Sequence, residues 1–195
     1  GLDYSSPDFY VDDQGNSPKK EKWFRVAEEK LAHAQRLLAN MQYNSKNYQK
    51  QLHKIRLLHE HIANQRKDFI HKESRRIANA YGAVCVEDLD LRAMSQSLNF
   101  GKATADNGFG MFRIALKYKL EEQGKHLIFI DKWYPSSKTC SFCGGYFGGL
   151  ELGQKEWVCP HCKKIIPRDK NAGINIKREG IRQFYEEQES TSSVA

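Results

Sequence analysis

Two Cys-x-x-Cys pairs place the strongest constraint on how this chain folds. Cys140 and Cys143 form the first pair, Cys159 and Cys162 form the second, and fifteen residues separate the pairs. This separation allows four thiolates to surround one Zn²⁺ ion in a tetrahedron. A disulfide framework would need an oxidising compartment, and a redox motif would account for one pair only. We therefore expect a four-cysteine zinc ribbon over residues 140–163, in which the metal is structural because no ligand position remains for water.

The fifth cysteine and the aromatic residues of the ribbon have simpler explanations. Cys85 lies in an apolar run, so we expect a small buried side chain. Tyr146, Phe147 and Trp157 lie between the two cysteine pairs. We expect them to pack the small metal-stapled hairpin, and stacking on nucleic-acid bases is the alternative.

The composition is that of a globular protein. Of 195 residues, 39% are hydrophobic and 28% are charged, which allows one buried core. The sequence contains no apolar run of the roughly 18 to 20 residues that cross a bilayer, and no charged-then-apolar leader opens it. These features predict an intracellular protein that neither spans a membrane nor is secreted. Because the first residue is Gly1 rather than Met, we also expect this chain to be cut from a longer one.

Basic charge is concentrated in one segment of the chain. The net charge is +7; residues 17–81 carry 15 Lys and Arg against 6 acidic residues, and the remainder carries 16 against 18. Apolar residues recur in this segment at helical spacing on both sides of a break at 44–47, which predicts a long antiparallel helical hairpin. Its charges either keep a coiled-coil-like arm soluble or bind phosphates. The candidates for phosphate contact on the second helix are Lys54, Arg56, Arg66, Lys67, Lys72, Arg75 and Arg76.

The rest of the sequence alternates between strand and helix patterns, which predicts an α/β fold. Residues 89–107 lack a clear period and are expected to be loop or short helix. The run at 126–130 is apolar enough for a buried strand, and the polar end of the chain at 189–195 is expected to be disordered. The expected strands are 1–4, 9–12, 83–86 and 126–130, and the expected helices are one ended by Gly124 and one over 170–187.

Three acidic residues occupy positions suited to metal binding. Asp3 lies on the first strand, Glu87 follows a buried strand, and Asp169 directly precedes the last helix. Hydrolysis of a phosphodiester on two Mg²⁺ ions requires carboxylates a few ångströms apart, commonly at strand ends. From the residues alone, solvated side chains, with Asp169 capping a helix, are the simpler explanation of these acids.

Five motifs, taken together, resemble the TnpB family. These are the OrfB-type proteins of bacterial insertion sequences, which are related to the type V CRISPR nucleases. The order and spacing of the motifs match over nearly the entire chain, which corresponds to the C-terminal half of the family's proteins. The motifs are residues 1–6, 64–72, 86–89, 133–141 and 169–175.

The resemblance implies a RuvC-like domain of the RNase H fold: a mixed sheet with flanking helices, a helical hairpin insertion at 17–81 and the ribbon. It implies that Asp3, Glu87 and Asp169 bind two catalytic Mg²⁺ ions in a DNA endonuclease guided by RNA. The helical hairpin would then hold backbone phosphates of guide and target. The implied domain boundaries are 1–139 for the first part of the nuclease domain, 140–163 for the ribbon, 164–188 for the final segment and 189–195 for the tail.

Two alternative functions remain compatible with the same resemblance. The first is a guided DNA-binding module or repressor that does not cleave, and the second is a transposase that performs strand transfer. The family also implies a cytoplasmic prokaryotic protein associated with the nucleoid. The sequence departs from the family pattern at Lys163, where a knuckle glycine is frequent, and at Gly173, which replaces an alanine and is expected to loosen the start of the last helix.

Overall fold

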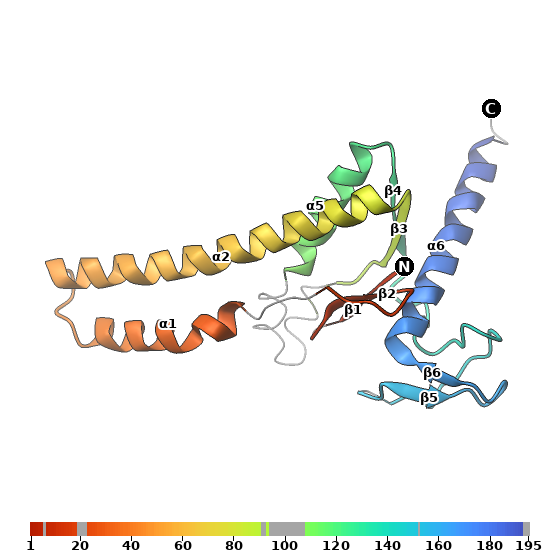
Figure 1. Cartoon of the computed structure of the whole chain (residues 1–195), viewed down its shortest axis with the longest axis horizontal. Helices are drawn as coiled ribbons and strands as arrows, with labels where there is room; N and C mark the ends of the chain where they lie inside the picture. Colours follow the sequence, from red (N-terminus) through yellow and green to blue (C-terminus); the bar gives the residue numbers. More distant parts are fainter. Residues whose placement is uncertain (6, 19–22, 91–92, 94–107, 152, 193–195) are drawn as a thin grey trace.

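A mixed four-stranded sheet forms the centre of the protein. The computed structural model describes residues 1–5, 7–18, 23–90, 93, 108–151 and 153–192 (Figure 1). The strand order is β2-β1-β3-β4, in which β1 pairs antiparallel with β2 and parallel with β3, and β3 pairs parallel with β4. This arrangement confirms the expected mixed α/β sheet. The strands are β1 (Leu2–Ser5), β2 (Phe9–Asp12), β3 (Ala83–Glu87) and β4 (His126–Ile130).

Helices cover both faces of the sheet. On one face, α2 (Lys46–Ala80) and α5 (Phe109–Glu121) bury the main core, which contains Val84 and Val86 of β3. On the other face, α6 (Arg168–Ser192) packs against β1 and β3. Successive side chains of a strand point to opposite faces, so Cys85 and Glu87 face α6. The core residues that α5 contributes are Phe109, Phe112, Ala115, Leu116 and Leu120.

The predicted helical hairpin is present and extends away from the sheet as an arm. It consists of α1 (Trp23–Ala39) and the longer α2, which lie side by side in Figure 1. Ser45 caps α2 by accepting a hydrogen bond from the backbone N–H of Tyr48, at 3.2 Å. Between the helices, Gln51 donates its side-chain amide to the carbonyl of Ala34. The apolar seam of the arm is formed by Trp23, Leu31, Ala34, Ile55 and Ile62.

Two expectations about the sheet and its last helix were wrong. The strand β4 is an edge strand whose buried residue is Ile130, while His126 and Phe129 are exposed. The helix α6 continues to Ser192, so residues 189–192 are helical rather than disordered, and residues 193–195 lie outside the described part. Within this extension, the hydroxyl of Ser190 donates to the carbonyl of Glu186, four residues earlier, at 2.9 Å. Most of the expected loop at 89–107 also lies outside the described residues.

The ribbon is a small separate layer beneath the start of α6 (Figure 1). Its strands β5 (Glu156–Val158) and β6 (Ile165–Pro167) pair antiparallel. Trp157 is buried and stacks on Phe147 with ring centroids 5.3 Å apart, so these two aromatic residues pack the ribbon as expected. Tyr146 remains 56% exposed. Among the described residues, none of the helices is both long and apolar enough to span a bilayer.

Glycines allow α6 to lie directly on the sheet. A Cβ atom at Gly180 would lie 2.5 Å from Sγ of Cys85, and one at Gly173 would lie 3.0 Å from backbone atoms of Asp12. Both distances are shorter than an ordinary van der Waals contact. Gly173 therefore permits close contact at the start of α6, which is continuous there despite the expectation that this glycine would loosen it.

Substitution of Gly180 tests this packing. We expect Gly180→Ala to lower the free energy of unfolding by about 1 to 3 kcal/mol, because the added methyl overpacks the contact with Cys85. Adding Cys85→Ala should recover part of that loss, since Sγ is the nearest atom. Gly82→Ala is the control, because a Cβ there meets nothing within 4 Å. Urea denaturation measures all of these variants, and equal losses for Gly180→Ala and Gly82→Ala would contradict the packing argument.

Candidate active site

Two of the three predicted acids lie on the face of the sheet that α6 covers. In β1, Leu2 belongs to the main core, so Asp3 points to the opposite face. In β3, Val86 belongs to that same core, so Glu87 also points to the opposite face. Because Leu2 pairs with Val86 in the parallel ladder, Asp3 and Glu87 are neighbours on adjacent strands.

The third acid reaches this site from α6. Asp169 lies in the first turn of the helix, where the positive end of the helix dipole favours a carboxylate. Its Oδ2 atom accepts a hydrogen bond from Nζ of Lys155 at 2.7 Å. The structure therefore brings together three acids that lie more than 80 residues apart in sequence.

The pKa values of Asp3 and Glu87 are both raised. Burial first, and then the charges of Glu87 and Asp169, raise the pKa of Asp3 well above its usual range. Burial also raises the pKa of Glu87, and the hydroxyl of Ser136, which donates to Oε1 of Glu87 at 2.6 Å, opposes that shift. The three carboxylates therefore concentrate negative charge around Asp3, and the nearby Arg168 and Lys155 compensate only part of it.

This donor set fits a hard divalent cation. Carboxylate oxygens are the ligands that Mg²⁺ prefers, and a bound cation would relieve the repulsion that raises the pKa of Asp3. Within the described part of the chain, the acids are less tightly gathered than the four cysteines, whose ligand atoms alone form a group within 4.8 Å. Lys155 and Ser136 hold two of the carboxylates in this arrangement.

Two asparagines that we did not single out hold the site together. Asn171 and Asn175 are 2% and 3% exposed on α6, and both donate side-chain amides to the carbonyls of Ser136 and Thr139. The Asn171 carbonyl accepts from the backbone N–H of Ser141 at 2.8 Å. They thus fix the loop after β4 and the first cysteine knuckle to α6. Both asparagines lie in the motif at 169–175, and their burial is what identifies their role.

The four cysteines have the geometry of a tetrahedral metal site. Sγ of Cys140 lies 3.7 Å from that of Cys162, and Sγ of Cys143 lies 3.6 Å from that of Cys159. A tetrahedron with Zn–S bonds of about 2.3 Å has edges of about 3.8 Å. All four sulfur atoms lie within 4.8 Å of one another. The expected four-cysteine cluster is therefore confirmed, and its dimensions fit zinc.

The two cysteine knuckles share one backbone pattern. Cys140 accepts a hydrogen bond on its carbonyl from the N–H of Gly144, and Cys159 accepts one in the same way from Lys163. Gly144 and Lys163 both have positive φ angles, 73° and 61°. Lys163 therefore adopts the left-handed conformation that a glycine usually supplies, so its presence does not prevent the knuckle from forming.

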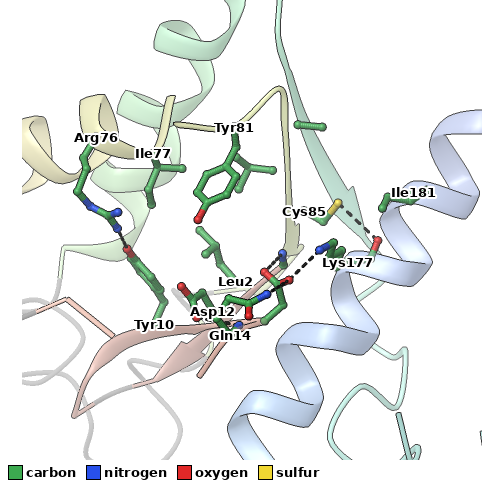
Figure 2. Close-up of a pocket in the computed structure, with 14 residues that line it drawn as sticks. Leu2, Tyr10, Asp12, Gln14, Arg76, Ile77, Tyr81, Cys85, Lys177 and Ile181 are labelled. Atoms are coloured by element: carbon green, nitrogen blue, oxygen red, sulfur yellow. Dashed lines mark hydrogen bonds and ion pairs between the residues drawn. The ribbon is translucent and has the colours of Figure 1, made fainter. Parts of the chain in front are cut away.

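An enclosed hollow of the described structure is not lined by any of the three acids. Figure 2 shows this cavity of about 160 Å³, lined in part by Tyr10, Arg76, Cys85 and Lys177. On β3 it is lined by Ala83, Val84 and Cys85, which precede the residue that pairs with Leu2. Arg76 donates to the hydroxyl of Tyr10 at 3.0 Å, so part of its polar lining is already paired.

A more open hollow begins at Asp88, the residue after Glu87, and none of the three predicted acids lines it. It has a volume of about 450 Å³ at the exits of β3 and β4 and is lined by Asp88, Asp131, Lys132 and Trp133, among others. Trp133 is 81% exposed, and Nζ of Lys132 lies 5.4 Å from the centre of its ring. This hollow is open, and acidic residues and one exposed aromatic residue line it.

The seven predicted phosphate-binding residues of α2 divide into two groups. Towards the sheet, Lys72 pairs with Asp68, Arg75 with Glu122, and Arg76 with Glu73. Further out, the exposed residues Lys54, Arg56 and Lys67 have no ion pair with another residue of the described segments, and Arg66 is half-buried.

Removing the charge of Asp3 should stabilise the protein in the absence of Mg²⁺. The raised pKa means that the folded state prefers protonated Asp3, so its contribution to stability is lost as pH rises from about 3.8 through the raised value. We expect Asp3→Asn to raise the free energy of unfolding at pH 7, with a smaller gain at pH 5. Urea titrations measure this, with exposed Glu121→Gln as control. A gain that is absent or independent of pH would contradict the electrostatic description.

Metal content tests the cysteine cluster. We expect about one zinc per purified chain, and a substoichiometric amount in Cys159→Ser, because zinc needs all four thiolates for its closed tetrahedron. Elemental analysis by mass spectrometry measures the ratio. Cys85→Ala is the matched control, since Cys85 is buried elsewhere against α6 and should leave the ratio at one. Equal zinc loss in both variants would contradict the assignment.

Two family models match most of the chain. A family model described as "Probable transposase" (OrfB_IS605) matches residues 1–98, and one described as "Cas12f1-like, TNB domain" matches residues 109–176. A solved structure, "Cryo-EM structure of the Cas12f1-sgRNA-target DNA complex", shares the fold with a TM-score of 0.58 at 21% identity. The match covers 83% of this chain and 43% of that one.

Two curated relatives are similar over most of the chain. A "Putative RNA-guided DNA endonuclease" of Streptomyces pristinaespiralis is 36% identical over 85% of this chain and 40% of its own length. "Putative RNA-guided DNA endonuclease InsQ" of Escherichia coli K12 is 29% identical over 80% of this chain and 42% of its own length. The chain thus spans about 40% of the length of these relatives. A family model that covers half of the sequence, together with these relatives, establishes that the chain belongs to the TnpB (OrfB) family of insertion-sequence proteins.

Proposed function

We propose that this chain is the nuclease portion of a transposon-encoded, RNA-guided DNA endonuclease. The observation that carries the proposal is the convergence of Asp3, Glu87 and Asp169 between the sheet and α6, where burial and the charges of Glu87 and Asp169 raise the pKa of Asp3. The names of the relatives support nucleic acid as the substrate, and their greater length supports a larger parent protein. DNA and a guide RNA are therefore the proposed partners.

The three acids would hold the catalytic Mg²⁺ ions. Bound there, the metal would supply Lewis acidity towards the phosphate and lower the pKa of a water molecule. Ser136 orients the carboxylate of Glu87 through its hydrogen bond, and the Asn171 and Asn175 amides keep Ser136 and Asp169 at a fixed separation. The four cysteines would hold a structural zinc, because their four thiolates complete its coordination.

The protein surface around the acids suits a single strand. Trp133 presents an exposed ring at the hollow that Asp88 and Asp131 line, and a base can stack on it. Lys155 and Arg168 bring positive charge next to the acids, where it can approach backbone phosphates. The cations of the outer part of α2, Lys54, Arg56 and Lys67, would hold phosphates further from the cut.

We assign a proposed role to each of the predicted segments. Residues 1–139 and 164–188 would form the nuclease domain, with 17–81 as the nucleic-acid-binding arm, and residues 140–163 would form the zinc ribbon. Because the first knuckle is hydrogen-bonded to α6, the ribbon would move together with Asp169 rather than as an independent module.

Cleavage of labelled single-stranded DNA tests the proposal. In Mg²⁺, the full-length protein purified with its bound RNA should cut, and Asp169→Asn should reduce the rate by about 100-fold or more, because a charge that stabilises the transition state is lost. Glu121→Gln removes an exposed carboxylate far along α5 and is the matched control.

The products and the binding data separate the alternatives. Equal cutting by wild type and Asp169→Asn would place the chemistry at another site. Binding of DNA without cutting by either protein would support a non-cleaving module. Joined products on a gel, rather than two shorter fragments, would support strand transfer.

A further inference from the structure

The position of Lys155 is fixed by the pairing of the ribbon's two strands. The carbonyl of Lys155 accepts a hydrogen bond from the backbone N–H of Arg168 at 2.8 Å. The next residue, Glu156, is paired with Pro167 in the β5–β6 ladder. Lys155 therefore lies opposite Arg168 and one residue away from Asp169, so its ion pair with Asp169 at 2.7 Å is a consequence of ribbon register.

The cysteine cluster sets this register. Cys159 and Cys162 lie in the turn between β5 and β6, and the N–H of Cys159 donates to the carbonyl of Lys164 at 2.9 Å. The next pair is Val158 with Ile165, and the one after it, Trp157 with Ile166, is buried in the ribbon core. The ribbon thus delivers a lysine side chain to a carboxylate of the acid cluster.

Lys155 partly offsets the charge of that cluster. The charges of Arg168 and Lys155 lower the pKa of Asp3, against the larger effects of burial, Glu87 and Asp169. The Lys155 ammonium contacts Oδ2 of Asp169, and the carboxylate of Asp169 is the group that would bind a hard cation. Two positive charges at one carboxylate oxygen repel each other, so the lysine and a divalent ion cannot share this position at full strength.

Lys155 is also free to leave. Its side chain is 64% exposed, while that of Asp169 is 22% exposed. A lysine has a flexible four-carbon stem, so the ammonium can swing away while the Lys155 carbonyl stays bonded to Arg168. The phosphate of a strand lying across the acids would be its nearest alternative partner.

We propose that Lys155 is a tethered counter-ion that competes with the divalent metal for Asp169. It neutralises part of the acid cluster when no metal is bound, and it transfers to a phosphate when a strand enters. Metal affinity is therefore low in the free protein and rises on strand binding. This inference rests on the proposed function, in which Asp169 is a metal ligand.

Binding of Mn²⁺ tests the competition without any cleavage assay. The zinc-loaded chain is titrated with Mn²⁺ in the absence of nucleic acid, and free Mn²⁺ is followed by electron paramagnetic resonance. We expect Lys155→Gln to bind Mn²⁺ about two- to fivefold more tightly than wild type, the range expected from losing a partly exposed ion pair. Lys164→Gln, which removes an exposed ribbon lysine lying over the ring of Phe142, is the matched control and should leave the affinity unchanged.

The Asp169→Asn variant separates failure of the inference from failure of the proposed function. If Asp169→Asn loses Mn²⁺ binding but Lys155→Gln binds no more tightly than wild type, the competition is refuted and the acid site stands. If Asp169→Asn binds Mn²⁺ normally, the metal site itself is refuted. Zinc content and melting temperature of each variant confirm that the ribbon is folded.

A second titration tests the transfer to phosphate. With an uncleavable phosphorothioate oligonucleotide present, the affinity of wild type should approach that of Lys155→Gln, because a phosphate then holds the lysine. An unchanged gap between the two proteins would overturn this step.

Discussion

The amides of Asn171 and Asn175 are the interaction on which the site depends. Both are buried, and both bind carbonyls of the loop that follows β4, whose own backbone groups would otherwise be unsatisfied. One end of that loop supplies Ser136 to Glu87, and the other end begins the ribbon at Cys140. Asp169 lies on the same helix as the two asparagines. This one pair of side chains therefore holds Asp169, the loop that contacts Glu87 and the start of the ribbon in a fixed arrangement.

The charges of the acid cluster lower the stability of the folded chain, and neutral contacts elsewhere in the fold offset this loss. Burial and mutual repulsion raise the pKa of Asp3, so the folded chain without metal carries an unfavourable charge there. The packing of α6 on the sheet, with Gly180 against Cys85, supplies contacts that do not involve these charges. The acids are therefore held in place by neutral interactions around them, and a cation at the site would stabilise the fold further.

Sequence patterns predicted the parts of the site that follow a period or a fixed spacing. The strand patterns predicted that Asp3 lies on the first strand and Glu87 at the end of a buried strand, as β1 and β3 show. The cysteine spacing predicted the four-cysteine cluster. The asparagine clamp could not be predicted in this way, because a hydrogen bond to a distant backbone carbonyl leaves no periodic pattern. The edge position of β4 was missed since an apolar run does not show whether a strand has one neighbour or two; in the fold, Arg113 covers exposed Phe129 at 4.9 Å.

Ion pairs within the protein decide which basic residues of the arm are available to bind a phosphate. An acid partner must be given up before Lys72, Arg75 or Arg76 can bind a phosphate, which offsets much of the gain. Lys54 and Arg56 carry no such cost among the described residues, and at 1.5 Å per residue they lie about 30 Å along α2 from Arg76. In the proposed nuclease, the strongest backbone contacts of the arm therefore fall roughly one turn of a nucleic-acid duplex away from the base of α2. Such contacts would orient the duplex, while the position of the cut would be set at the acids themselves.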